Sequence, residues 1–301
     1  QECVRFEREL APDVITTLST QYGQVDLGFI PAAQWADEGA WIGFSLTRTI
    51  STPTGVAQLI GEILQLGLKL WWRDEAQKIG LKAERPLAPD ELVQSYTDAA
   101  DIVAGSLDRE ELHDQRVTSV ILYHGLLDAT GSTSDAANYA RAAGASNGGS
   151  DSDKHNQQRI LEIYSPWLGE GNDNVAEAVV QRLAERFKDA PLQVTFQLNR
   201  KDRDRTAPGD FAQLTSRVLT DEFGRSTTTE VILTSVEEIK SGHELAVKAI
   251  SQGFSGRFIY LLTDSAPDYD AATDDEKAFG WWLIDEDEDA FDDGGSPYLM
   301  F

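Results

Sequence analysis

Four histidines in this sequence are candidates for metal binding: His113, His124, His155 and His243. Zinc sites are usually signalled by short spacings such as HExxH or CxxC, which bring two ligands to one helical turn or one loop. None of the four histidines stands in such a spacing, so the sequence predicts no zinc site. We expect them on the surface or in turns, with His124, at a strand end, the least ordinary of the four.

Carboxylates offer a second kind of chemistry. Asp285–Asp289 is a run of five acids, but a calcium loop needs Gly at its sixth position and Glu at its twelfth, where this sequence has Ala290 and Ser296. A solvated charge run is the prediction, with loose binding of a divalent cation as the alternative. Asp268 and Asp270 resemble an acid–base pair, yet such pairs arise by chance among 51 acidic residues.

Motifs for nucleophiles and phosphates are also missing. Ser255 lies in the stretch Gly253–Gly256, which lacks the Gly-x-Ser-x-Gly spacing of a nucleophile elbow. Ser146–Ser150 is rich in glycine but lacks the Lys-Ser/Thr pair of a phosphate-binding loop, so we expect a flexible tip. The sequence therefore predicts no catalytic, cofactor-binding or metal-binding residues, and a protein that is not an enzyme.

Lys69–Ala83 contains two adjacent tryptophans, and apolar and polar residues alternate on both sides of a central turn. This period of two is typical of a β-hairpin. We expect Trp72 in the core, and Trp71 on the surface with Lys69 or Arg73 packed on its ring. The alternative is that Trp71 forms an aromatic platform for a sugar or a base.

The composition sets limits on the class of protein. The chain has 301 residues, of which 41% are hydrophobic, which is enough for about two domains with real cores. Its net charge of −25 repels phosphate backbones, so tight binding of nucleic acid is disfavoured. No apolar run is long enough to span a membrane. Cys3 is the single cysteine, which rules out an intrachain disulfide. Since the first residue is Gln, we expect a piece of a longer gene product.

Helices are predicted where apolar residues recur every three or four positions. The expected helices are Asp13–Tyr22, a helix from Thr52-Pro53 to Gly67, and Val175–Phe187. An aromatic-rich connection with Phe29, Trp35, Trp41 and Phe44 is expected between the first two. Asp128–Asp153, rich in small and polar residues, is expected to be a long exposed excursion.

Strands are predicted where β-branched or alternating apolar runs lie between turn signals. They are Arg116–Tyr123, Arg159–Trp167, Gln193–Leu198, Phe211–Leu219, Thr227–Val236, Glu244–Ala249 and Arg257–Leu262. The predicted class is α+β, with mostly antiparallel, barrel-like sheets and a few packed helices. We expect an α/β subdomain with the hairpin (1–112), a β-rich domain containing the excursion 128–153 (113–262), and an acidic, aromatic extension (263–301). In the extension, aromatics such as Trp281 and Trp282 are expected to pin the segment in place.

Seven stretches, taken in order, resemble the tail hub, or tail-tip, proteins of tailed bacteriophages and gene transfer agents. The ordered series carries the resemblance, and it runs nearly from end to end. The stretches are ITTLSTQYGQVDLGFIP (15–31), TISTPTGVAQLIGEILQLGLKLWWRDEAQKIGLKAERP (49–86), DQRVTSVILYHG (114–125), RILEIYSPWL (159–168), LAERFKDAP (183–191), VTFQLNRKDRDRTAPGDFAQLTSRVLTDEFG (194–224) and GFSGRFIYLLTDSAPDYDAATDDEKAFGWW (253–282).

The resemblance implies a structural role in the virion. Hub proteins of this family form a trimer at the distal end of the tail tube, which they cap or gate during host attachment and DNA delivery. Their partners are distal-tail and tube proteins, the tape-measure protein and tail fibres, and their barrel domains are similar to tail-tube domains. Some relatives carry a cysteine-rich iron–sulfur segment, which a chain with Cys3 alone does not match. No cofactor is therefore expected.

Two other classes of function remain open from the sequence. One is a hydrolase of cell-wall glycan, which needs a cleft with paired carboxylates about 5–9.5 Å apart. The other is a carbohydrate-binding module that uses Trp71 and Trp41.

Overall fold

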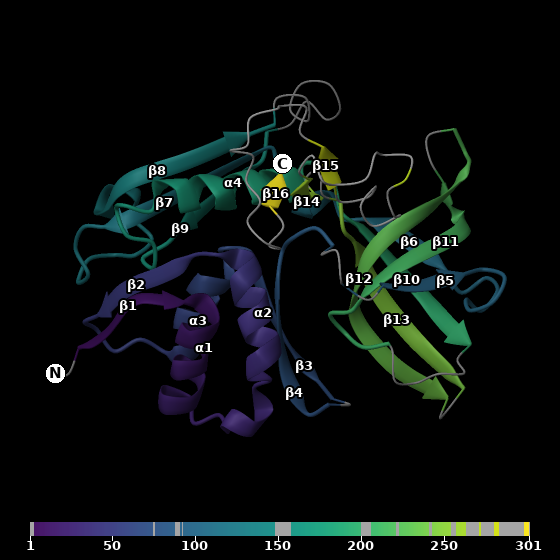
Figure 1. The fold of residues 1–301 in the computed structure, drawn as a ribbon, viewed down its shortest axis with the longest axis horizontal. Helices are drawn as coiled ribbons and strands as arrows, with labels where there is room; N and C mark the ends of the chain where they lie inside the picture. The colour runs from purple at the N-terminus through teal and green to yellow at the C-terminus, as the bar shows by residue number, and fades with distance from the viewer. Residues whose placement is uncertain are drawn as a thin grey trace.

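The structure forms its helices and strands largely where apolar residues recur at helical or strand spacing. The computed structural model describes residues 3–74, 76–87, 91, 93–147, 158–199, 206–220, 223–240, 243–253, 257–262, 271, 280–282 and 298–300. The first elements are β1 (Val4–Leu10), α1 (Ala11–Thr17), η1 (Leu18–Tyr22), η2 (Leu27–Phe29), α2 (Ala32–Ile42), β2 (Ser45–Ile50), α3 (Val56–Leu64), β3 (Leu68–Arg73) and β4 (Lys78–Ala83) (Figure 1).

Strands dominate the rest of the chain, with one long helix among them. These elements are β5 (Val93–Thr97), β6 (Asp108–Glu111), η3 (His113–Gln115), β7 (Ser119–Leu126), η4 (Ala136–Asn138), β8 (Tyr139–Ser146), β9 (Ile160–Tyr164), α4 (Asp173–Phe187), β10 (Leu192–Asn199), β11 (Phe211–Thr220), β12 (Ser226–Lys240), β13 (Glu244–Ser251), β14 (Arg257–Leu262), β15 (Gly280–Trp282) and β16 (Tyr298–Met300). No helix in the described part of the chain has the length and apolar character to cross a bilayer.

The first hydrophobic core lies between helices and small sheets. It joins α1, α2 and α3, the pair β1–β2 and the hairpin β3–β4 to the sheet β8-β7-β9, which α4 covers on one face. Trp35 and Trp167 are its largest fully buried side chains. Gly43 (φ 67°) and Gly67 (φ 91°) adopt left-handed backbone just after α2 and α3, where a side chain would be strained.

The second core lies on a six-stranded sheet in the order β5-β11-β12-β13-β10-β6. Its neighbouring strands are antiparallel except β5, which runs parallel to β11. The sheet ends in two edge strands, β5 and β6, so no closed barrel forms in the described residues. The α+β class with mostly antiparallel sheets is confirmed, and the barrel-like description applies only loosely.

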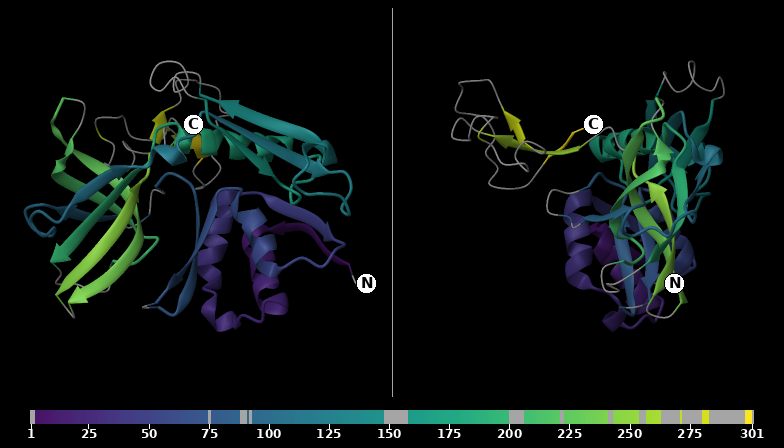
Figure 2. Two further views of the ribbon diagram at one scale, coloured as in Figure 1. Left: turned by 180° about the vertical axis from the view of Figure 1, so that it is seen from behind. Right: turned by 90° about the vertical axis from the view of Figure 1, so that its right-hand side faces the viewer.

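The two cores draw on alternating parts of the sequence. Buried residues of the first core lie at 6–83 and 120–184, and those of the second at 96–102 and 194–249. In Figure 1 and in the back view of Figure 2, the hairpin β3–β4 lies between the helices and the six-stranded sheet. The boundaries at 112 and 262 stay predictions, because buried clusters alone do not define folding units.

Two predicted connections are regular elements in the structure. The expected link with Trp35 and Trp41 contains α2, although Gly39 lies inside the helix and lowers its intrinsic propensity. The expected excursion Asp128–Asp153 contains β8, which pairs antiparallel with β7 over its whole length. Its Ala, Gly and Ser residues have low strand propensity, so pairing with β7 overrides the local preference.

The hairpin forms in the expected register, but both tryptophan placements are wrong. Trp72 is 45% exposed at the end of β3, because the apolar face of the hairpin extends beyond the core there. Its ring meets that of Phe29 edge-on, 5.6 Å between centroids. Trp71 is half-buried and lies against Gly209, which belongs to the turn before β11 in the second core. The partner of Trp71 is thus a distant part of the same chain.

Near the C-terminus, β14 forms a three-stranded sheet, parallel with β15 and antiparallel with β16. The side view in Figure 2 shows these strands projecting from the rest of the described elements. The structure describes only short backbone stretches of residues 263–301 and none of their side-chain contacts, so the prediction that aromatics pin this segment stays a prediction.

Candidate functional site

A groove of about 680 Å³ at the junction of the two cores brings titratable and aromatic side chains together. Such a combination is the first place to look for a functional site. We call it the junction groove; it is lined by Gln34, Asp37, Glu38, Ala40, Trp41, Trp71, Arg73, Lys82, Arg85, Glu91, Gly209, Asp210 and Phe211. A smaller pocket of about 180 Å³ beside α3 has no charged lining residue and offers less chemistry.

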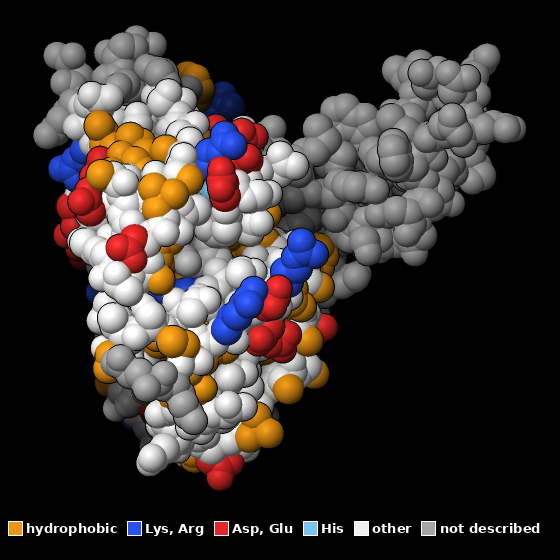
Figure 3. Space-filling model, turned by 90° about the vertical axis from the view of Figure 1, so that its left-hand side faces the viewer, with side chains coloured by type: hydrophobic (Ala, Val, Ile, Leu, Met, Phe, Trp, Pro, Cys, Tyr) orange, Lys and Arg blue, Asp and Glu red, His pale blue; other side chains and the backbone are white. Residues whose placement is uncertain are grey.

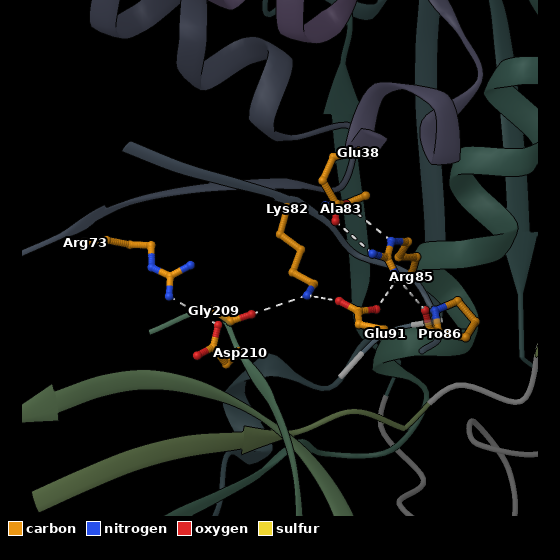
Figure 4. Close-up of polar contacts among 9 residues, drawn as sticks. All are labelled: Glu38, Arg73, Lys82, Ala83, Arg85, Pro86, Glu91, Gly209 and Asp210. Carbon is orange, nitrogen blue, oxygen red and sulfur yellow. Dashed lines mark hydrogen bonds and ion pairs between the residues drawn. The ribbon is translucent and has the colours of Figure 1, made fainter. Parts of the chain in front are cut away.

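Arg85 is the centre of the charges at the groove (Figure 4). Its guanidinium donates to both oxygens of Glu38, at 2.8 and 3.3 Å, and to Glu91 at 2.8 Å. Glu38 comes from α2 and also accepts from the backbone N–H of Ala83 at 3.0 Å. Because Arg85 and Glu38 are buried, these paired contacts in fixed geometry offset the cost of removing the charges from water.

Lys82 connects this cluster to the second core. Its ammonium is paired with Glu91, donates to the carbonyl of Gly209 at 3.4 Å and lies 3.8 Å from the ring centroid of Phe211. Lys82 lies on β4, whereas Gly209 and Phe211 lie in and just after the turn that opens β11. We call Glu38, Lys82, Arg85 and Glu91 the junction cluster, since their contacts reach from α2 and β4 to the six-stranded sheet.

Trp71 makes the apolar half of the same link. A Cβ added to Gly209 would lie 1.8 Å from Cζ2 of Trp71, and one added to Gly80 would lie 2.5 Å from its Cε2. The indole therefore occupies space that two glycines leave free. Arg73, two residues along β3, adds a contact of 3.5 Å with Asp210.

The pKa values follow from burial and pairing. Burial acts to raise the pKa of Glu91, but Arg85 and Lys82 outweigh it, so this pKa lies below its usual value. Burial lowers the pKa of Lys82 although Glu91 acts in the opposite direction. Burial also acts against the charge on Arg85, but Glu38 and Glu91 outweigh it and raise its pKa. Glu91 and Arg85 are thus held in their charged forms.

Two further buried arginines, Arg182 and Arg186, lie on α4. Arg186 of α4 donates to the carbonyl of Ser251, at the end of β13, at 2.7 Å, and lies 3.5 Å from Glu84. Arg182, one turn earlier, donates to the carbonyl of Leu66 at 2.7 Å. Burial lowers the pKa of Arg182 to about 10, with Glu84 opposing the change. Arg186 therefore ties the long helix to the second core.

The three histidines that the structure describes do not gather into a site. His124 is buried, which contradicts the expected surface or turn position: its Nδ1 lies 3.1 Å from the carbonyl of Gly169 and its Nε2 lies 3.5 Å from Asp173. Gly125, which follows it, has left-handed backbone (φ 72°). His113 and His243 are exposed, as expected. His155 lies outside the described residues.

Other predicted candidates also lie outside the described residues: Asp268, Asp270, Ser255 and the run Asp285–Asp289. Cys3 is exposed immediately before β1. In the part of the chain that the structure describes, no three His, Cys, Asp or Glu side chains are grouped to hold a metal ion.

The charges of the groove suit cohesion better than catalysis. A glycosidase needs one carboxylic acid whose pKa is raised. In the groove, the neighbouring Arg85 and Lys82 instead lower the pKa of Glu91. The structure does bring Trp41 and Trp71 to one groove, but Arg85 lies 5.4 Å from the ring centroid of Trp41 and glycine backbone covers Trp71.

Sequence reasoning missed the junction cluster because its partners are far apart in the chain. Glu38 is 47 residues from Arg85, and Gly209 is 127 residues from Lys82. One local signal was present: Gly80 pairs directly with Trp71 across the hairpin, and a glycine opposite a large aromatic indicates that the ring crosses the neighbouring strand.

Comparison with known proteins adds three solved structures. The chain is similar to the tail protein from Neisseria meningitidis MC58 (13% identity, TM-score 0.46, covering 82% of this chain and 68% of that chain). It is similar to the 43 kDa tail protein of prophage MuSo2 from Shewanella oneidensis (11% identity, TM-score 0.46, 82% and 66%). The third is prophage tail protein gp18 from Listeria monocytogenes EGD-e (13% identity, TM-score 0.38, 68% and 56%).

The sequence matches no protein-family model and no curated protein. Their own descriptions call the first a tail protein and the other two prophage tail proteins. At this level of identity and superposition, no residue's role passes from them to this chain.

Proposed function

We propose that this chain is a structural component of a bacteriophage or gene-transfer-agent tail, placed at the tail tip as a hub. The ordered resemblance of seven stretches between residues 15 and 282 supports the tail assignment. A hub transmits load between tube and fibres, so its parts must keep their relative positions. The proposed role is structural and does not include catalysis.

The observation that best supports an architectural role is the junction cluster. Arg85, Lys82 and their acidic partners are buried charges that bond to one another and to the backbone of the second core. Groups held in this way fix two cores against each other, and their charges are neutralised within the protein. A general acid must keep its proton near neutral pH, which the lowered pKa of Glu91 does not allow.

The proposed assembly is a homotrimer on the tail axis. Its proposed partners are distal-tail and tube proteins, the tape-measure protein and tail fibres, and its proposed place is the distal end of the virion tail. The net charge of −25 suits a lumen through which DNA passes without binding. This chain spans 68% and 66% of the first two similar structures, so the partners of the whole protein are part of the proposal.

Reconstruction of the native particle tests this function. The proposal predicts density for this chain at the distal end of the tail, in three copies around the axis. A position along the tube, on the head, or as a single copy off the axis would contradict the hub role. Absence of the chain from every purified particle would contradict the tail role itself.

The glycan hydrolase and the carbohydrate-binding module are the rival functions. The module has one observation in its favour, the convergence of Trp41 and Trp71 on the junction groove. A zymogram on peptidoglycan tests the hydrolase, and a glycan-binding screen with the parent chain and Trp41→Ala tests the module. A cleared zone, or binding that Trp41→Ala abolishes, would replace the architectural proposal.

A further inference from the structure

β8 is an edge strand with an unusual composition for this acidic chain. In the sheet order β8-β7-β9 it pairs with β7 and leaves its other side open among the described residues. Its eight residues, YARAAGAS, include one charge, at Arg141. Edge strands of soluble proteins are usually short, charged, bulged or covered, because a bare edge recruits other strands.

A second edge in the same molecule shows the usual protection. β6, at one end of the six-stranded sheet, is four residues long and reads Asp-Arg-Glu-Glu, with all four residues exposed. β8 is twice as long and lacks that protection. Of these two edges, β8 is therefore the one that an added strand can approach more readily.

The hydrogen bonds show which backbone groups of β8 point outward. The backbone N–H of Asn147 donates to the carbonyl of Thr118 at 2.9 Å. Counting back from Asn147 in this register, the backbone groups that bond to β7 belong to the odd-numbered residues of β8. On the far side of β7, Ser165 donates to Tyr123, in keeping with the same alternation. In an antiparallel ladder alternate residues face opposite neighbours. Along the second half of β8, the N–H and C=O groups that face away from β7 belong to Ala142, Gly144 and Ser146, all exposed.

The side chains around this edge favour close approach. Residues 142–146 are alanine, glycine and serine, so larger side chains of an added strand have room beside them. The outer face of the sheet carries the stacked rings of Tyr123 and Tyr164, 4.9 Å between centroids, and Ile160, which is 52% exposed. Figure 3 shows hydrophobic side chains gathered on the upper part of the molecule, where this sheet lies.

Charge identifies the kind of strand that fits. Exposed Asp128, Asp135 and Glu170 surround the start of β8, and hydrogen bonds from Thr130 lower the pKa of Asp128. Arg141 faces Glu170 at 3.8 Å and offsets part of this charge. The rest of the edge is neutral. A second copy of this chain brings another net charge of −25, which makes it a poor occupant.

We propose that the edge of β8 binds an extended segment of a different polypeptide, which adds to the sheet as a fourth strand beside β8. The segment is uncharged opposite Ala142–Ser146 and carries a lysine or arginine at the end beside Tyr139. The main-chain ladder supplies affinity, and the acidic start of β8 sets the register of the added strand. This inference stands on the sheet alone and does not require the hub role.

Peptide binding with residue-resolved amide exchange tests the proposal. The probe is a peptide that alternates threonine and valine over eight residues and ends in two lysines; its counterpart ends in two glutamates. The variants are Ala142→Pro, which removes an outward N–H without breaking the ladder to β7, and the matched control Ala142→Val. Parent and A142V are expected to bind the lysine peptide at least about tenfold more tightly than A142P, the loss expected for one or two ladder bonds.

Amide exchange shows where the peptide lies. With the lysine peptide bound, the amides of Ala142 and Gly144 should be protected at least about tenfold, while that of Ala143, which already faces β7, should not change. Equal binding by A142P and A142V, unchanged exchange at Ala142 and Gly144, or no preference for the lysine peptide would overturn the proposal. Protection that rises with the concentration of the chain alone would assign the edge to a second copy, which also overturns it.

Discussion

The interior of the first core and the junction between the two cores are held together by different forces. The first is largely apolar, with buried side chains such as Val14, Ile63 and Leu122 in contact across helices and sheets. The second depends on the junction cluster and on one indole ring set between glycines. Burial of apolar area tolerates small shifts, whereas a buried ion pair needs its partner in place. The junction should therefore be the more sensitive of the two to single changes.

Arg85→Met should have the largest effect. It leaves Glu38 and Glu91 buried without their main cation, so we expect a loss of about 3–5 kcal/mol in the free energy of unfolding. Arg73→Met is the matched control, because Arg73 is partly exposed and makes one contact of 3.5 Å. It should cost no more than about 1 kcal/mol. Urea denaturation measures both, and equal losses would remove the distinction between the junction and an ordinary surface pair.

The adjacent tryptophans should differ in the opposite sense to the sequence prediction. Trp71→Ala removes the apolar link to Gly209 and should cost about 2–4 kcal/mol, since the site is only partly buried. Trp72→Ala should cost less than about 1 kcal/mol, because Trp72 is 45% exposed. Midpoints of chemical denaturation compare the two. A larger loss for Trp72→Ala would mean that the hairpin packs differently.

Gly209→Ala tests the fit between the ring and the turn. The new Cβ meets Trp71 and the backbone has φ 87°, so we expect a loss of about 1–3 kcal/mol. In a double-mutant cycle, Trp71→Ala removes the clash and leaves only the backbone strain. The cost of Gly209→Ala should therefore be smaller in the Trp71→Ala background. Strictly additive losses would show that the ring and the glycine do not interact.

The smallest expected effect concerns pH. The pKa of Glu91 is lower in the folded chain than its ordinary 4.5, so its ionised form stabilises the fold above that value, and this stability is lost as pH falls through the folded pKa. Glu91→Gln should reduce the loss of melting temperature between neutral pH and about pH 3, relative to the parent. Parallel pH profiles for the two proteins would show that Glu91 is not paired as described.

The sequence predicted what is local and missed what is long-range. Period-two alternation was enough for the pairing of the hairpin, because Leu70 and Leu81 face each other across one turn. The helix α2 was not predicted, although Pro31 before it and Gly43 after it are helix-boundary signals. The contacts of Arg85 and Lys82 could not be predicted, since no periodicity relates a strand-end cation to an acid or a carbonyl elsewhere in the chain.

Scanning calorimetry tests the central claim, that the junction cluster joins two cores into one cooperative unit. The parent chain should unfold in a single transition whose van't Hoff and calorimetric enthalpies agree. Arg85→Met should separate this into two transitions, one for each core, whereas Arg73→Met should leave it single. Two separate transitions in the parent, or a single unsplit transition in Arg85→Met at undiminished temperature, would contradict the account.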